Sequence, residues 1–393
     1  MIDLGIVGGG PAGSMAAWEA ARRGLSVMLW EKDRFPRDKV CGEFLSAECL
    51  PLLHEAIPRA LGRSAVIRGV ELIPRRGRTC TFDLPQPARG LSRWVMDHAL
   101  LEGARAEGAS VREGEEVRSV RKLKATAAFK DVSGEALMGS ALADGGWEIL
   151  TKSGDTARIS SLLVAGGRWW NIEGLPSLQD KGRKAWLGVK AHMSGLTPRP
   201  VVELYFFPGG YCGLAPIEDG LTNVCCLVDS SVARCQGGHG LGDLAAWLKR
   251  LAGHPPLEER LRGAVQASRT LATAPVHLGK RDAVENDIAL AGDAAGFLDP
   301  FAGSGISLAL HSGRLAAEVC AHGSAGKVAN GGRACFEEYQ RRLSWSSRRS
   351  YGVASWLREL VRAPECVQSL LALIARPMVG MRLFDETRWR ESG

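Results

Sequence analysis

Three glycines near the N-terminus have the spacing of a phosphate-binding turn. Gly8, Gly10 and Gly13 follow an apolar run that predicts a strand, and the small-residue stretch 16–21 behind them predicts a helix. The first glycine permits a tight turn, the second lets the backbone approach a pyrophosphate, and the third lets helix and strand pack closely. The predicted helix N-terminus offers free N–H groups to an anion. The residues predicted to hold a dinucleotide here are Gly8, Gly10, Pro11, Ala12 and Gly13.

An acidic residue follows where such a turn requires one. Glu31 ends the second predicted strand, about 20 residues beyond the turn, where a carboxylate accepts hydrogen bonds from ribose hydroxyls. Lys32 comes directly after it and is included among the predicted cofactor-binding residues.

A second strand, turn and helix lie at residues 287–320. The strand delivers Gly292 and Asp293 to a turn, where the acid would accept a hydrogen bond from a sugar or ribityl hydroxyl; alone, it would be read as a helix N-cap. The turn Gly303-Ser304-Gly305 then opens a helix at Ile306. Its free amides suit a ligand that gains negative charge, such as the N1–C2=O edge of a reduced flavin.

Other chemistries find little support in the sequence. There is no Ser-His-Asp set and no paired carboxylates, and the ten cysteines form no C-x-x-C or zinc spacing, so we expect no metal. The net charge of +7 is spread out, which argues against nucleic-acid binding. The cysteines and the strand beginning at Ile2, which leaves no room for a signal peptide, predict a cytoplasmic protein.

Together these segments resemble the FAD-dependent oxidoreductases of the para-hydroxybenzoate hydroxylase-like superfamily, and within it the geranylgeranyl reductase-related group. The resemblance also rests on Arg93, which opens a predicted helix, on Pro300, and on the segment 37–43 with its Cys-Gly pair. It implies FAD as cofactor and NAD(P)H as a candidate transient electron donor. It places Arg93 near the cofactor phosphates, Asp293 at the ribityl chain, and Arg37 and Cys41 close to the cofactor.

One motif departs from that family. Many members carry Ala-Asp-Gly near the middle of the chain, where this sequence reads Ala165-Gly166-Gly167-Arg168. Gly167 remains a predicted cofactor-binding residue, but the lost carboxylate leaves the use of NADPH open. The Trp-x-Trp-x-Ile-Pro signature of flavin-dependent halogenases is absent, which argues against halogenation.

The fold class expected is α/β: a Rossmann-like FAD-binding domain, a discontinuous substrate domain built on an antiparallel sheet, and C-terminal helices. The expected FAD-binding domain comprises 1–65, 93–180 and 275–330; the substrate domain comprises 66–92 and 181–274; a helical cap spans 331–393. Alternating apolar and polar residues at 186–228 predict the antiparallel sheet. The substrate candidates on its strands are His192, Tyr211 and Cys212.

Three functions stay open at this stage. The sequence favours a monooxygenase that hydroxylates a bulky, apolar aromatic or polyketide-like molecule. The alternatives are a geranylgeranyl reductase-like enzyme that saturates prenyl double bonds, and a non-catalytic flavin-binding module. The basic, apolar C-terminal segment predicts a cover over the substrate cavity, with peripheral membrane contact as the second interpretation.

Overall fold

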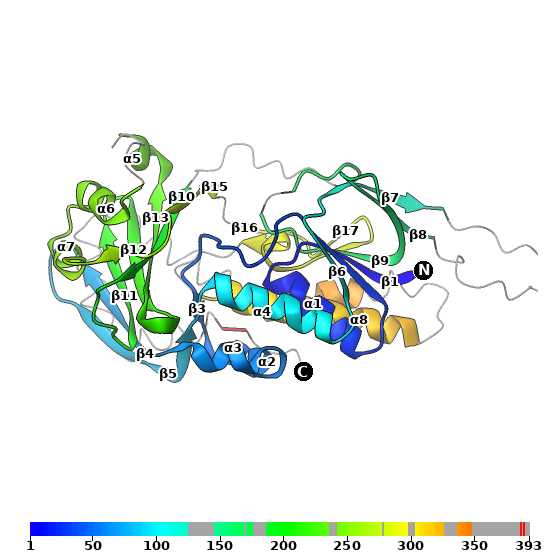
Figure 1. The fold of residues 1–393 in the computed structure, drawn as a ribbon, viewed down its shortest axis with the longest axis horizontal. Coiled ribbons are helices and arrows are strands. Elements are labelled where there is room, and N and C mark those ends of the chain that lie inside the picture. Colours follow the sequence, from blue (N-terminus) through cyan, green and yellow to red (C-terminus); the bar gives the residue numbers. More distant parts are fainter. Residues whose placement is uncertain are drawn as a thin grey trace, which may run out of the picture.

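Two β-sheets organise the chain, as the computed structural model in Figure 1 shows. The structure describes residues 1–124, 145–168, 170–175, 186–235, 242–276, 279–297, 303–325, 336–347, 386 and 388–389. Pro300 and most of the predicted cap at 331–393 lie outside the described residues. None of the described helices is both long and apolar enough to cross a membrane.

The first sheet has a parallel centre assembled from distant parts of the sequence. In spatial order its parallel strands are β18 (Ile288–Leu290), β9 (Thr156–Val164), β1 (Ile2–Val7), β2 (Val27–Glu31) and β6 (Ser110–Glu113). Antiparallel strands extend it: β17 (Val284–Glu285), β7 (Val117–Leu123) and β8 (Gly146–Thr151). Because the strands lie parallel, the carboxyl ends of β1, β2, β9 and β18 meet at one edge, where α/β sheets bind their ligands.

Three helices cover one side of this sheet (Figure 1). They are α1 (Pro11–Arg22), α4 (Arg93–Ala106) and α8 (Gly305–Ala325), and α1 contacts both others. The approach of α8 to α1 depends on a glycine, since a Cβ at Gly313 would lie 2.1 Å from the Ala12 carbonyl oxygen. Shorter helical elements are η1 (Ala47–Cys49), α2 (Leu50–Ala56), α3 (Pro58–Arg63), η3 (Gly292–Ala294) and residues 336–347.

The second sheet is antiparallel except where β4 runs parallel to β11. Its strands are β3 (Phe44–Leu45), β4 (Ala65–Pro74), β5 (Cys80–Gly90), β10 (Trp186–Ser194), β11 (Val201–Phe207), β12 (Gly210–Pro216), β13 (Thr222–Asp229), β14 (Val265–Gln266) and β15 (Leu271–Val276). The remaining elements are η2 (Glu218–Gly220), α5 (Ser230–Cys235), α6 (Leu244–Ala252), α7 (Pro255–Arg260), β16 (Gly279–Lys280) and β19 (Gly296–Phe297).

Alternation along the strands gives this sheet two different faces. On β10, Val189 and Ala191 pack in one apolar core with Trp247 of α6, which covers the outer face. Lys190 and His192 point the other way, and their side chains meet the loop between β2 and β3. We call this second surface the inner face. The expected fold class is thus confirmed, while the exact domain boundaries stay a prediction.

Candidate functional site

The glycine turn joins β1 to α1 at the carboxyl edge of the first sheet. Gly8 has a φ of +106°, and a Cβ there would lie 2.5 Å from the Ala165 carbonyl oxygen. A Cβ at Gly13 would lie 1.8 Å from the Gly8 carbonyl oxygen. At Gly10, by contrast, the nearest atom outside its chain neighbours is Arg37 Nη2, 4.0 Å from an added Cβ. The turn is therefore closed toward the protein and open where a pyrophosphate would approach.

The N-terminus of α1 is free to bind an anion. Pro11 opens the helix, no side chain caps it, and its first turn holds no acidic residue. The unpaired N–H groups and the positive end of the helix dipole thus face the open side of the turn. These features fit the phosphates of FAD.

Glu31 shapes the turn as well as ending β2. Its carboxylate accepts hydrogen bonds from the Gly9 N–H at 2.7 Å and the Asp33 N–H at 2.9 Å, and the residue is buried. Each oxygen keeps a further lone pair for a ribose hydroxyl. Lys32, its neighbour, is exposed.

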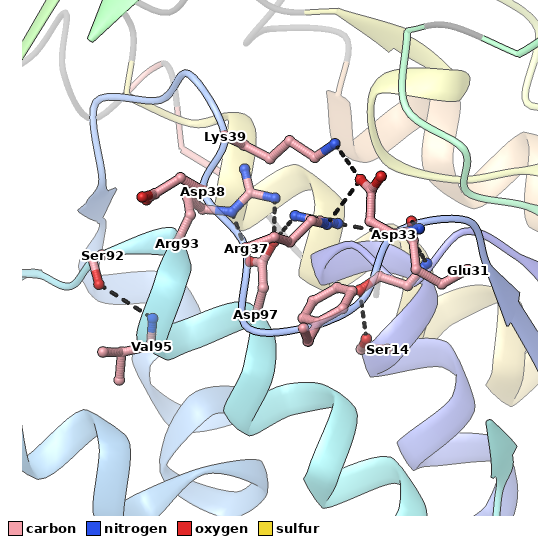
Figure 2. Close-up of polar contacts among 12 residues, drawn as sticks. Ser14, Glu31, Asp33, Arg37, Asp38, Lys39, Ser92, Arg93, Val95 and Asp97 are labelled. Carbon is pink, nitrogen blue, oxygen red and sulfur yellow. Dashed lines mark hydrogen bonds and ion pairs between the residues drawn. The ribbon is translucent and has the colours of Figure 1, made fainter. Parts of the chain in front are cut away.

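Two predicted arginines share one buried carboxylate, as Figure 2 shows. Asp97 accepts from Arg37 Nη1 at 2.9 Å and from Arg93 Nε and Nη2 at 2.7 Å each. Burial alone would lower the pKa of Arg93, but Asp97 raises it above its usual value. Arg37 also lies 3.4 Å from Asp33 Oδ2 and 3.8 Å from Glu31 Oε2, so this arginine ties the loop after β2 to α4 beside the glycine turn. Sequence reasoning missed Asp97, although its position four residues after Arg93 on a helix was a signal.

The segment 37–43, here called the Cys41 loop, crosses from the first sheet to the inner face of the second. Asn223 Nδ2 donates to the Cys41 carbonyl oxygen at 2.9 Å. A Cβ at Gly188 of β10 would lie 3.1 Å from Val40 Cγ1, so the loop packs directly on the strand. Burial raises the pKa of the Cys41 thiol, which therefore stays protonated at neutral pH.

Glu43 is the centre of a buried group of charges that sequence reasoning missed. Its Oε1 accepts from Lys190 Nζ at 2.5 Å and from the Arg93 backbone N–H at 2.8 Å, and its Oε2 lies 2.7 Å from His192 Nε2. Asp38 Oδ1 lies 3.2 Å from the same ammonium. Burial opposes the charge on Lys190, but Glu43 raises its pKa above the usual value. We call Asp38, Glu43, Lys190 and His192 the Glu43 cluster.

Three members of this cluster have the chemistry of metal ligands. Atoms of Asp38, Glu43 and His192 lie within 4.8 Å of one another. However, Lys190 Nζ bonds to both carboxylates and supplies the positive charge that they require. The cluster is therefore better described as a proton-bearing ion-pair network than as a metal centre.

The second predicted cofactor segment packs on the first. Gly292 follows β18 with a φ of +62°, and a Cβ there would lie 3.0 Å from the Ala12 Cβ. Asp293 comes next, at the start of the turn, and no described residue hydrogen-bonds to its side chain. Burial raises the pKa of this carboxyl group, and Arg168 and Arg93 oppose the increase. The position fits a ribityl hydroxyl.

The glycine turn before α8 closes the same edge of the sheet. Gly303 has a φ of +63° and approaches Phe44, while Gly305 has open space where a side chain would stand. Ser304 and Ile306 are buried beside it. Gly167, in the turn after β9, also has a positive φ of 74° and open space. Lys32 is exposed. The other described members of the predicted cofactor set thus lie along the carboxyl edge of the first sheet or in the Cys41 loop beside it.

The substrate candidates divide between the two faces of the second sheet. His192 and Tyr211 lie on the inner face. Cys212 points to the outer face, where its sulfur lies 3.7 Å from Cys226 in the core beneath α6. Neighbouring strand residues face opposite ways, so Tyr211 and Cys212 cannot line the same cavity.

The inner face also carries an apolar wall. Trp186, Phe206, Tyr211 and Leu227 form a buried cluster, and Phe297 of β19 packs against it from the first-sheet side. The wall lies on the same face of the second sheet as the Glu43 cluster. An apolar surface and hydrogen-bonding side chains with exchangeable protons therefore occur on the strands that face the cofactor edge.

The fold and the carboxyl edge of the first sheet define a dinucleotide-binding oxidoreductase, and comparisons with known proteins agree. Residues 6–37 match the family model of the NAD(P)-binding Rossmann-like domain. Digeranylgeranylglycerophospholipid reductase 2 of Methanopyrus kandleri is 30% identical over 81% of this chain and 76% of its own length. Menaquinone reductase of Mycobacterium tuberculosis is 27% identical over 81% of this chain and 76% of its own length.

Solved structures show the same fold. A geranylgeranyl bacteriochlorophyll reductase-like protein of Thermoplasma acidophilum superimposes with a TM-score of 0.75 and 20% identity, over 98% of this chain and 95% of that one. Flavin-dependent halogenases also share the fold. The chain belongs to the FAD-dependent oxidoreductases of the para-hydroxybenzoate hydroxylase-like superfamily, in the geranylgeranyl reductase-related group. It is a flavoenzyme, which sets aside the non-catalytic alternative.

Proposed function

We propose that the enzyme uses FAD to reduce carbon–carbon double bonds in a prenyl chain. This reverses the preference drawn from the sequence, which favoured a hydroxylase. The observation that carries the proposal is the inner face of the second sheet, where an apolar wall adjoins a buried proton-bearing cluster. The reductase names of two relatives add support.

The apolar wall suits a hydrocarbon substrate. Trp186, Phe206, Tyr211 and Leu227 are each at most 9% exposed. These side chains are therefore shielded from water, and a prenyl chain that packed against them would gain about 25 cal/mol per Å² of apolar area removed from water. It also excludes water from the space beside the cofactor.

The Glu43 cluster suits the proton that double-bond reduction consumes. Bound reduced FAD would supply a hydride to one carbon of the double bond. The other carbon needs a proton, and the 2.7 Å contact between His192 Nε2 and Glu43 Oε2 holds one within the buried site. Lys190 Nζ donates to the other carboxylate oxygen of Glu43, so this carboxylate joins two hydrogen-bonding side chains within the site.

The test uses FAD-loaded enzyme that has been reduced chemically under strict anaerobiosis. Mixing with a prenylated lipid should restore the oxidised-flavin absorbance, and the product should gain two hydrogens by mass spectrometry. A product that gains an oxygen atom only after air is admitted would refute the reductase and establish a hydroxylase.

A hydroxylase is the second candidate because the wall is rich in flat rings. Trp186, Phe206 and Tyr211 would pack well against an aromatic or polyketide-like substrate. For either reaction we propose NAD(P)H as electron donor and a small apolar molecule as substrate. Anaerobic reduction of the flavin by NADPH, compared with NADH, tests the donor independently of the substrate.

A further inference from the structure

Two buried hydrogen-bond donors follow β9 without an acceptor. Arg168 Nη1 and Trp170 Nε1 are both buried, and neither has a partner in the described part of the chain. The other hydrogen bond of the guanidinium is a long one, from Nη2 to Thr273 Oγ1 at 3.3 Å. A buried donor left without an acceptor costs about 1–3 kcal/mol, so such donors usually mark the place of a ligand or water.

Arg168 also has no bonded counter-ion among the described residues. No described carboxylate forms an ion pair with it, and burial lowers its pKa against the opposing influence of Asp293. Buried arginines elsewhere in the chain differ: Arg93 bonds to Asp97, and Arg260 bonds to Glu203.

The surroundings of Arg168 supply donors and a cationic surface. Its guanidinium stacks over Phe297 at 4.6 Å, and the guanidinium of Arg281 lies 5.7 Å from the Trp170 ring. Thr273 belongs to β15 of the second sheet, so Arg168 spans from the end of β9 to that sheet. Guanidinium and indole N–H groups together favour an oxyanion, and arginine matches phosphate oxygens in a bidentate manner.

We propose that Arg168, with Trp170 and Arg281, binds a phosphate group of a ligand other than FAD. Two sources have this chemistry: the pyrophosphate of a dinucleotide electron donor, and the phosphate of a lipid substrate. The site extends the proposed function, but binding at it does not require that the enzyme reduce double bonds.

Calorimetric titration of the FAD-loaded enzyme with inorganic pyrophosphate at low salt tests the proposal. Arg168→Gln should weaken binding by about tenfold or more, as expected for lost hydrogen bonds to a charged group. Trp170→Phe removes the indole N–H, together with one of the two fused rings, and keeps an aromatic side chain. It should weaken binding severalfold, and it still tests the proposal if Arg168→Gln fails to fold. The control is Arg158→Gln, which makes the same charge change on β9, ten residues earlier, at a side chain 65% exposed, and should change affinity by less than about twofold.

Competition then separates the two sources. Displacement of bound pyrophosphate by NADPH identifies the electron donor, and displacement by a polyprenyl monophosphate identifies the substrate; either supports the site. Three outcomes would overturn it: no binding to the FAD-loaded enzyme, binding unchanged in both Arg168→Gln and Trp170→Phe, or binding only after FAD is removed, which would assign the donors to the cofactor itself.

Discussion

Replacing Glu43 by Gln should be among the most destabilising single changes near the site. Glu43 is fully buried, and its carboxylate accepts from Lys190, His192 and the Arg93 backbone. The substitution leaves the Lys190 ammonium, 1% exposed, with Asp38 at 3.2 Å as its remaining carboxylate. Removing one partner of a buried ion pair costs about 3–5 kcal/mol. We therefore expect the free energy of unfolding to fall by that amount.

Urea unfolding of the FAD-loaded protein, followed by tryptophan fluorescence and by flavin release, measures the change. The double variant Glu43→Gln with Lys190→Met should recover part of the loss, because it also removes the stranded charge. The matched control is Glu102→Gln, which breaks a surface pair with Arg105 at a side chain 47% exposed and should cost about 0–1 kcal/mol. If Glu43→Gln cost no more than this control, the cluster would not be the buried charge centre described above.

Three further predictions test other parts of the structure. Gly13→Ala should abolish stoichiometric FAD binding, because the added Cβ would overlap the Gly8 carbonyl oxygen; the flavin absorbance per protein measures this. The control is Gly62→Ala, on a helix with open space around the added Cβ, which should stabilise the fold by about 0.5–1 kcal/mol, as measured by the urea midpoint. Asp293→Ala should weaken FAD binding about two- to tenfold in equilibrium titrations, as the loss of one hydrogen bond predicts, and unchanged affinity would remove this residue from the cofactor site. Burial lowers the pKa of His254 below 6.5, so the unfolded chain takes up a proton at this residue first and the free energy of unfolding falls as the pH drops below 6.5. His254→Asn should make the free energy of unfolding depend less steeply on pH between pH 7 and pH 5. An equal dependence in both proteins would contradict the assignment.

Much of the cofactor edge could be predicted because its requirements are local. The turn needs glycine at Gly8 and Gly13, because a Cβ at either position would lie 2.5 Å or less from a backbone carbonyl oxygen. The Asp293 turn could be recognised for the same reason. Arg37 and Arg93 were predicted separately, but their common partner Asp97 emerges only when the loop after β2 lies against α4.

The amino-acid sequence by itself determined the class of fold and the cofactor, since strand, glycine turn and helix are encoded by short runs of residues. Only the tertiary structure decided the substrate side. Lys190 and Glu43 are separated by 147 positions, so no local pattern joins them. Tyr211 and Cys212 are adjacent, yet the pleat of β12 sends one to the inner face and the other to the outer core. The unpartnered donors of Arg168 and Trp170 likewise emerge only from the packing around them, because whether a polar group finds an acceptor depends on every element that surrounds it.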